Sequence, residues 1–328
     1  MLKSIYIFLR YFPFYLKLYL DFRRVRKYTQ KLLINVKSKF ENWQELVDTA
    51  NEKRMMDYIF VQTMWASGFC LLRGDRMKDN ELKAIVNISA LAPLYDDFFD
   101  KVSLSSEKIH FLVNTPFDYT AETDIEKLFI EFSQNIHKNV INIPFYLENA
   151  LRVFKAQYES KRLVSDKEMT RSEVELIAFE KGASTVICMC NMLNKPLTIQ
   201  EESIMNQLGA VAQFLDDIFD LWEDFDEGRQ TLSNPSSDID HLEELFLKEV
   251  SSLKKYLFKS GFKTGNINAF YFPVSYLIGA TRVCLGIYKK LQKKTNNIFM
   301  VEKYSRKDMV CDMEDPLVRL KAFRLSEF

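Results

Sequence analysis

Hydrophobic side chains recur along most of the chain at every third or fourth position, which is the spacing of amphipathic helices. This spacing predicts helices over residues 42–72, 80–100, 125–158, 170–193, 198–224, 241–259 and 269–294, and in a terminal segment that extends to residue 325. With only 9 Gly and 8 Pro, the chain also lacks the turn residues that a many-stranded fold needs. We therefore predict an all-α protein.

Individual residues predict where several of these helices begin and end. Asn80 is a suitable N-terminal cap, and Pro93, inside the helix that follows, is expected to kink it because proline has no backbone N–H to donate. Thr198 and Glu201 have the spacing of a capping box at the start of the long helix 198–224. Gly228 follows that helix and predicts its end.

The charge of the chain is zero overall but unevenly distributed. Residues 1–39 contain ten Lys or Arg and a single acid, Asp21, so this segment has a net charge of +9. Its aromatic first half and cationic second half are typical of a segment that contacts a membrane surface, and equally of an N-terminal helix that packs on the protein. No nucleic-acid-binding motif accompanies it. We therefore predict a basic, aromatic segment over residues 1–40 and a single all-α domain over residues 41–328.

Two further features bear on the cellular compartment. Arg10, Pro13 and Lys17 interrupt the first apolar stretch before it reaches the length of about 20 residues that spans a bilayer. The five cysteines are odd in number and lie in apolar surroundings, which does not favour a disulfide framework. We expect a cytoplasmic protein, and the basic segment leaves open a peripheral contact with a membrane through residues 1–39.

Two acidic clusters lie among large apolar side chains, where unpaired carboxylates are costly. They comprise Asp96, Asp97 and Asp100 in the first cluster, and Asp216, Asp217, Asp220 and Asp224 in the second. Carboxylates one helical turn apart repel each other, so such clusters are tolerated when they are solvated or neutralised by cations. Oxygen ligands without a nearby His or Cys select Mg²⁺ or Mn²⁺, and Mg²⁺ commonly bridges carboxylates to phosphate oxygens. The clusters therefore predict a metal site that binds a diphosphate.

The second cluster also matches two known motifs. Gly209, Gln213, Asp216, Asp217 and Asp220 match the G-x-x-x-Q-x-x-D-D-x-x-D pattern of trans-prenyltransferases. Asp216, Asp220 and Asp224 have the spacing of the second metal motif in terpene synthases, and Lys181-Gly182-Ala183 looks like a shortened version of the lysine-containing helix of prenyltransferases. The chain thus resembles the class I isoprenoid synthase superfamily, which includes trans-prenyl diphosphate synthases and class I terpene synthases.

This resemblance implies a fold, a cofactor and a set of site residues. The expected fold is an antiparallel helical bundle around a central cavity, with three Mg²⁺ ions between the two aspartate clusters. All seven aspartates are the implied metal ligands. The implied contacts to the diphosphate are Lys181, Gln213, Asp217, Arg229, Lys303, Tyr304 and Arg306. Catalysis would consist of Lewis-acid and electrostatic stabilisation of the pyrophosphate that leaves.

The surroundings of the first cluster help to choose the reaction. Chain-elongating prenyltransferases usually place paired arginines shortly after this motif, whereas Lys101-Val102-Ser103 follows here. Arg73-Gly74-Asp75-Arg76 is at most a degenerate form of their upstream element. We therefore predict a class I terpene synthase that converts a prenyl diphosphate into a cyclic or linear terpene and pyrophosphate.

Several alternatives stay open at this point. They are a trans-prenyltransferase that condenses an allylic diphosphate with isopentenyl diphosphate, an enzyme of head-to-head prenyl condensation, and a non-catalytic, membrane-associated binding subunit. The sequence also leaves open whether the chain forms a homodimer.

Overall fold

The computed structural model describes residues 2–100, 105–164, 167–234 and 236–326; the side chains of residues 2–11, 13, 98–100 and 106 lie outside this description. The described residues form fourteen α-helices and two short 3₁₀ helices, and their only β-type pairing is an isolated bridge between Val164 and Arg229. The prediction of an all-α protein is therefore confirmed. The chain divides into two compact units: unit 1 comprises Met1–Arg10, Lys155–Ile187 and Thr198–Phe328, and unit 2 comprises Tyr11–Phe154 and Cys188–Leu197.

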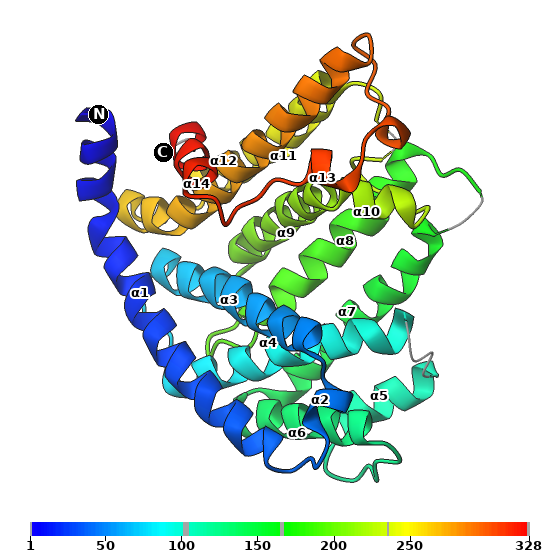
Figure 1. Cartoon of the computed structure of the whole chain (residues 1–328). Coiled ribbons are helices and arrows are strands. Elements are labelled where there is room, and N and C mark those ends of the chain that lie inside the picture. The colour runs from blue at the N-terminus through cyan, green and yellow to red at the C-terminus, as the bar shows by residue number, and fades with distance from the viewer. Residues whose placement is uncertain (1, 101–104, 165–166, 235, 327–328) are drawn as a thin grey trace. The chain divides into compact units, whose positions relative to one another are not determined.

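Unit 2 is built around a central helix, α4, which packs against α3 and α6 (Figure 1). The helices that contribute to this unit are α1 (Leu2–Lys37), α2 (Trp43–Leu46), α3 (Thr49–Leu72), α4 (Asp79–Asp100), α5 (Ser106–Asn114), α6 (Asp124–Asn139) and α7 (Ile143–Ser160). Every residue of α3 from Gln62 to Leu72 is buried, so this half of α3 forms part of the core.

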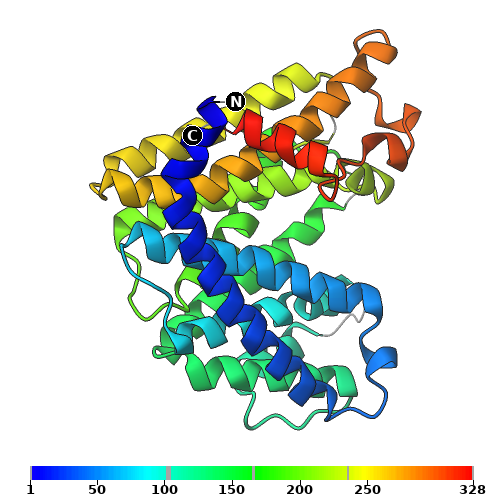
Figure 2. The ribbon, with the colours of Figure 1, turned by 60° about the vertical axis from the view of Figure 1, so that its left-hand side comes forward.

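Unit 1 is centred on α9 and α12, which pack against each other and against α11. Its helices are α8 (Arg171–Cys190), α9 (Ile199–Phe219), α10 (Leu221–Asp226), α11 (Ile239–Lys259), α12 (Thr264–Lys294), α13 (Arg306–Met309) and α14 (Pro316–Leu325), with 3₁₀ turns at Lys161–Leu163 and Val301–Lys303. Figure 2 shows α14 lying along α12. The two helices approach closely at Gly279, where a Cβ atom would lie 2.1 Å from the carbonyl oxygen of Ala322.

Within residues 42–158 the structure corrects the predicted helices at three places. The predicted helix 42–72 is two helices, because Asp48 caps α3 by accepting a hydrogen bond from a backbone amide of its first turn. The predicted helix 125–158 is also two, since α6 ends at Asn139 and the side chain of Asn142 caps α7. Helix α5 was not predicted; its cap is Ser105. These breaks depend on side-chain caps that hydrophobic spacing does not reveal.

Two of the predicted helix ends are confirmed. The side chain of Thr198 accepts from the backbone amide of Glu201, and Glu201 accepts from that of Thr198, so the capping box is confirmed. Gly228, which follows α10, has a φ of +67°, as expected for a glycine that ends a helix. Pro93 lies inside α4, and the helix continues past it to Asp100.

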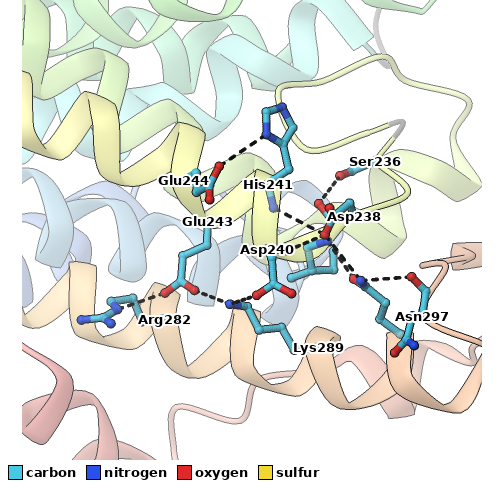
Figure 3. A network of polar contacts seen from close by, with 11 residues as sticks. Ser236, Asp238, Asp240, His241, Glu243, Glu244, Arg282, Lys289 and Asn297 are labelled. Atoms are coloured by element: carbon cyan, nitrogen blue, oxygen red, sulfur yellow. Dashed lines mark hydrogen bonds and ion pairs between the residues drawn. The ribbon is translucent and has the colours of Figure 1, made fainter.

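A network of ion pairs joins the start of α11 to α12 (Figure 3). The carboxylate of Glu243 lies 3.1 Å from Arg282 Nε and 2.5 Å from Lys289 Nζ, and Lys289 also pairs with Asp240. Asp238 caps α11 by accepting a hydrogen bond from the backbone amide of Asp240. These contacts tie together two of the helices that pack against α9.

Helix α12 is apolar along much of its length. Among the described helices it is the one whose length and composition would allow it to cross a bilayer, but 67% of its most apolar stretch is buried inside the structure. Ile278, Cys284 and Leu285 on this helix are completely buried. The apolar composition of α12 is therefore that of a core helix.

The cysteines contribute small buried side chains. All five are free thiols, and four of them are buried. Burial raises the pKa of Cys70 and of Cys188 to about 12, so these two thiols remain protonated at neutral pH. This agrees with the expectation that the chain has no disulfide framework.

Candidate functional site

The second acidic cluster lies where α9 meets α10, in unit 1. The sequence predicts one continuous helix through Asp224, whereas the structure has two, with Asp220 between them. Two side chains from elsewhere in the unit bind carbonyls in the last turn of α9: the hydroxyl of Ser233 donates to the carbonyl of Asp217, and that of Tyr288 donates to the carbonyl of Ile218 at 2.9 Å. Side-chain donors inserted at this point account for the interruption.

The interruption leaves the spacing of three aspartates unchanged. The amide of Asp220 donates to the carbonyl of Asp216 at 2.9 Å, and the amide of Asp224 donates to that of Asp220 at 2.8 Å. Asp216, Asp220 and Asp224 therefore remain one helical turn apart, and we call them the aspartate row. Solvent reaches Asp216 and Asp220, while Asp224 is half-buried.

Asp217 points inward and differs from the row. Its side chain is only 4% exposed, and both carboxylate oxygens accept hydrogen bonds: from Gln213 Nε2 at 2.8 Å and from the backbone amide of Leu232 at 2.8 Å. Asp217 thus ties the loop that follows α10 to the end of α9. The sequence predicts that Gln213 contacts the substrate. In the structure its side-chain amide donates one of the two hydrogen bonds that Asp217 accepts.

The pKa values of all four aspartates are raised. Burial is the main cause throughout, and it raises the pKa of Asp217 to about 6, of Asp220 to about 7 and of Asp224 to about 8. Neighbouring carboxylates raise these values further, whereas Lys181 opposes the rise at Asp216. Solvent reaches Asp216 and Asp220 directly, but dense protein around them still disfavours the ionised form. In the absence of a bound cation, the row therefore retains protons at a higher pH than ordinary aspartates do.

A close contact between α8 and α9 lies one to two turns before the row. A Cβ atom on Gly182 would lie 2.2 Å from the carbonyl oxygen of Gly209, and one on Gly209 would lie 2.4 Å from Ala183 Cα. Only glycine allows the two backbones to come so near. The contact confirms that the small residues after Lys181 permit close approach, and it places Lys181 where its charge acts on Asp216 and Asp217.

Two predicted cationic contacts already pair with acids near the row. Arg229 Nε lies 3.5 Å from Asp224 Oδ1, and its Nη2 lies 3.3 Å from Glu227. Arg306 Nε lies 2.5 Å from Glu223 Oε1, so the first side chain of α13 contacts α10. Both arginines are therefore near α10, and Arg229 is the one that touches the row itself.

Lys303 and Tyr304 have different surroundings. Lys303 is exposed, whereas Tyr304 is buried, with its hydroxyl 2.5 Å from Thr295 Oγ1. The indole N–H of Trp222 donates to the backbone carbonyl of Tyr304 at 3.3 Å. Tyr304 thus packs beside α10 with its hydroxyl already bonded within unit 1.

The first acidic cluster lies near the end of α4, in unit 2. Arg54 on α3 binds both of its described side chains: Nη1 lies 2.8 Å from Asp97 Oδ1 and Nη2 lies 3.3 Å from Asp96 Oδ2. The hydroxyl of Tyr58, one turn further along α3, donates to Asp96 at 3.1 Å. The side chain of Asp100 lies outside the described residues.

Arg54 and Tyr58 were not identified from the sequence. The signal available was weak: a cation and a hydroxyl four residues apart on a helix that precedes the acidic one. Only the packing of α3 against α4 shows that they face Asp96.

The donor sets fit a hard divalent cation. Within the part of the chain that the structure describes, no three His, Cys, Asp or Glu side chains are gathered closely enough to hold a metal ion as they stand. The oxygens of Asp216, Asp220 and Asp224 are nevertheless of the kind that Mg²⁺ and Mn²⁺ prefer. Burial raises the pKa of each of these side chains, and neighbouring carboxylates add to the rise at Asp220 and Asp224. A cation bound there would have to draw these side chains together. At Asp96 and Asp97 it would also have to displace Arg54.

The structure therefore brings the predicted residues together in two groups. Unit 1 contains the aspartate row with Asp217, Gln213, Lys181 and Arg229, and unit 2 contains Asp96 and Asp97 with Arg54. In comparisons with known proteins, the chain matches no protein-family model and no curated protein. The family resemblance thus continues to depend on the sequence motifs.

Proposed function

We propose that the chain is a class I terpene synthase, which ionises a prenyl diphosphate in the presence of Mg²⁺ and forms a terpene and pyrophosphate. The main support is the aspartate row: three carboxylates one turn apart, with raised pKa values, beside the cation Lys181. Such an arrangement is costly for folding alone, because like charges lie close together in partly desolvated surroundings. Binding of divalent cations would relieve this cost.

Each residue of unit 1 has a proposed role. Asp216, Asp220 and Asp224 hold Mg²⁺, which when bound supplies Lewis-acid stabilisation of the departing pyrophosphate. Lys181 and Arg229 donate hydrogen bonds to diphosphate oxygens, and charge-assisted bonds of this kind are strong. Asp217 positions Gln213 and the loop at Leu232 through its two hydrogen bonds. No side chain acts as a nucleophile.

The first cluster completes the proposal. Asp96, Asp97 and Asp100 would supply further metal ligands, and Arg54 would have to release Asp96 and Asp97 when a cation binds them. That both clusters act on one diphosphate is what the resemblance to class I isoprenoid synthases implies.

Pyrophosphate release tests this proposal. We expect the purified full-length chain with Mg²⁺ to release pyrophosphate from geranyl, farnesyl or geranylgeranyl diphosphate. Asp220→Ala should reduce release by at least about a hundredfold, because the metal-held charge stabilisation would be lost. Asp226→Ala is the matched control: this carboxylate is exposed, lies at the end of α10, which begins directly after Asp220, and is outside the row.

Three outcomes would contradict the proposal. If none of the three substrates releases pyrophosphate, the proposed synthase activity is excluded and a non-catalytic binding subunit is favoured. Equal activity of the Asp220→Ala and Asp226→Ala variants would exclude the row as the metal site. Product formation that requires isopentenyl diphosphate would identify a prenyltransferase instead.

A further inference from the structure

The outward side of α1 exposes an unusual set of side chains. Five large apolar residues are exposed within nine positions: Phe12, Tyr15, Leu16, Tyr19 and Leu20. Four cations follow on the same side and are also exposed: Arg23, Arg26, Lys27 and Lys31. The three- and four-residue spacing of these positions places them on one side of the helix, which we call the outer face of α1.

The opposite side of α1 is fixed to unit 2. Val25, Leu32 and Val36 are buried, which is the expected inward stripe of an amphipathic helix. Arg24 lies on the inward side as well, where it bonds to Asp21, to Asp79 and to the carbonyl of Met77. The outer face is therefore displayed on a helix that the rest of the unit holds in place.

The structure separates seven of the ten cations of residues 1–39 into two kinds. Lys37 and Lys39 pair with Glu52 and Glu131 at 2.7 Å, so together with Arg24 they stabilise the fold. The four cations of the outer face form no ion pair with any described residue. The single acid of residues 1–39, Asp21, is buried on the inward side, so the outer face has no negative charge of its own.

Three of these cations surround a shallow hollow of about 330 Å³. Arg23, Arg26 and Lys27 line it together with Tyr19, Phe22 and Gln30. The ring of Phe22 stacks on that of Phe60 of α3, with the ring centroids 4.7 Å apart. The hollow thus presents cationic and aromatic groups together at the point where the apolar part of the outer face ends.

We propose that the outer face of α1 binds the surface of an anionic lipid bilayer. Leu16, Leu20 and the rings of Tyr15 and Tyr19 would enter the boundary between headgroups and acyl chains, where such side chains are favoured. Arg23, Arg26 and Lys27 would bind lipid phosphates, with the hollow accommodating a headgroup. This assigns membrane contact to one face of one helix.

Charge complementarity favours a bilayer over a protein partner. An uncompensated cationic surface beside exposed aliphatic and aromatic groups matches the two layers of an anionic membrane, which offers phosphates at its surface and hydrocarbon beneath them. The inward side of α1 is already occupied, so the helix would lie in the membrane surface and would not cross it.

Vesicle sedimentation with the full chain tests the proposal. We expect binding to phosphatidylserine–phosphatidylcholine vesicles, much weaker binding to phosphatidylcholine alone, and loss of binding as NaCl rises from about 0.1 to about 1 M. The triple variant Arg23→Gln/Arg26→Gln/Lys27→Gln should bind roughly a hundredfold more weakly, at about fivefold per cation. Leu16→Ser/Leu20→Ser should also weaken binding at about 0.1 M NaCl, because it removes the apolar part of the outer face.

A second triple variant controls for net charge. Lys290→Gln/Lys293→Gln/Lys294→Gln removes three exposed cations from the end of α12 and should bind vesicles as the parent does. Equal loss in both triple variants, or no binding of the parent to anionic vesicles, would overturn the proposal. So would unchanged vesicle binding in the outer-face variants together with loss of a dimer in light scattering, which would make a second copy the occupant.

This proposal is independent of the catalytic one. The outer-face variants change no residue that we place at the aspartate row, so pyrophosphate release from a dissolved short-chain substrate should remain at the parental rate. Circular dichroism would verify that the variants keep their helicity. Each proposal can therefore fail without the other.

Discussion

Arg54 Nη1 lies 2.8 Å from Oδ1 of Asp97, so a side chain of α3 already neutralises a carboxylate that the sequence predicts to be a metal ligand. The same guanidinium reaches Asp96 through its other terminal nitrogen. A guanidinium and a divalent cation that use the same oxygens compete with each other. If a metal ion binds at this cluster, we expect it to compete with Arg54 for these oxygens.

Replacing Arg54 tests this competition. Arg54→Gln should strengthen Mn²⁺ binding roughly tenfold, because two half-exposed ion pairs of about 0.5–1 kcal/mol each are removed. Electron paramagnetic resonance of free Mn²⁺ measures the change without any substrate. Arg73→Gln is the control, since Arg73 bonds to the carbonyls of Lys195 and Pro196 in the same unit. Unchanged or weaker binding in Arg54→Gln would exclude competition.

Replacing Asp217 and replacing Asp220 should change the free energy of unfolding by different amounts. Asp217→Ala leaves the buried amide of Leu232 without its acceptor, which should cost about 1–3 kcal/mol in the free energy of unfolding. Asp220→Ala removes a solvent-accessible carboxylate whose pKa is raised to about 7, so at pH 8 it should cost little or increase stability. Urea denaturation without divalent cations distinguishes the two. A comparable loss in both variants would show that Asp217 does not anchor the loop.

The row also predicts how stability depends on pH. Folding raises the pKa of Asp220 to about 7 and of Asp224 to about 8, above the value near 3.9 of an unfolded chain. A carboxyl whose pKa is raised by folding contributes stability that is fully present below pH ~4. This contribution is lost as the pH rises through the folded-state values of about 7 and about 8. In EDTA, the Tm of the parent should therefore fall between pH 5 and pH 8 more steeply than that of Asp220→Asn/Asp224→Asn.

Added Mg²⁺ extends this prediction. At pH 8 it should raise the Tm of the parent, because a ligand that binds only the folded state stabilises it, and should leave that of the double variant nearly unchanged. Thermal scans by circular dichroism give both values. Identical pH profiles for parent and variant would contradict the assignment of raised pKa values to these two aspartates.

A single added methyl group tests how much the close contact between α8 and α9 contributes to stability. In Gly209→Ala the new Cβ would lie 2.4 Å from Ala183 Cα, so the helices must separate, and we expect a loss of about 1–3 kcal/mol or more. Gly286→Ala on α12 is the matched control: its Cβ meets nothing within 4 Å, so the better helix propensity of alanine should leave stability unchanged or raise it by up to about 1 kcal/mol. Urea denaturation measures both. Equal stability of the two variants would show that the contact is not essential.

Much of the fold follows from local sequence signals. The capping box at Thr198 and the end of α10 at Gly228 appear in the structure as predicted, because caps depend on residues within one turn. The breaks before α3 and α7 were missed, since hydrophobic spacing continues across Asp48 and Asn142 and only their hydrogen bonds show that a new helix begins. The spacing of Asp216, Asp220 and Asp224 is likewise local, and it survives the interruption at Asp220.

The sequence by itself determined the all-α class, most helix positions, the aspartate row and the basic character of residues 1–39, because each depends on spacing along a single helix or on composition. The tertiary structure decided which groups these residues meet. Arg54 pairs with Asp97 across 43 positions, and Tyr288 binds the carbonyl of Ile218 across 70. Packing also divided the cations of α1 into those that hold the fold and those that face outward. Such partners depend on how helices pack, and the burial that raises the pKa values of the row exists only once they have packed.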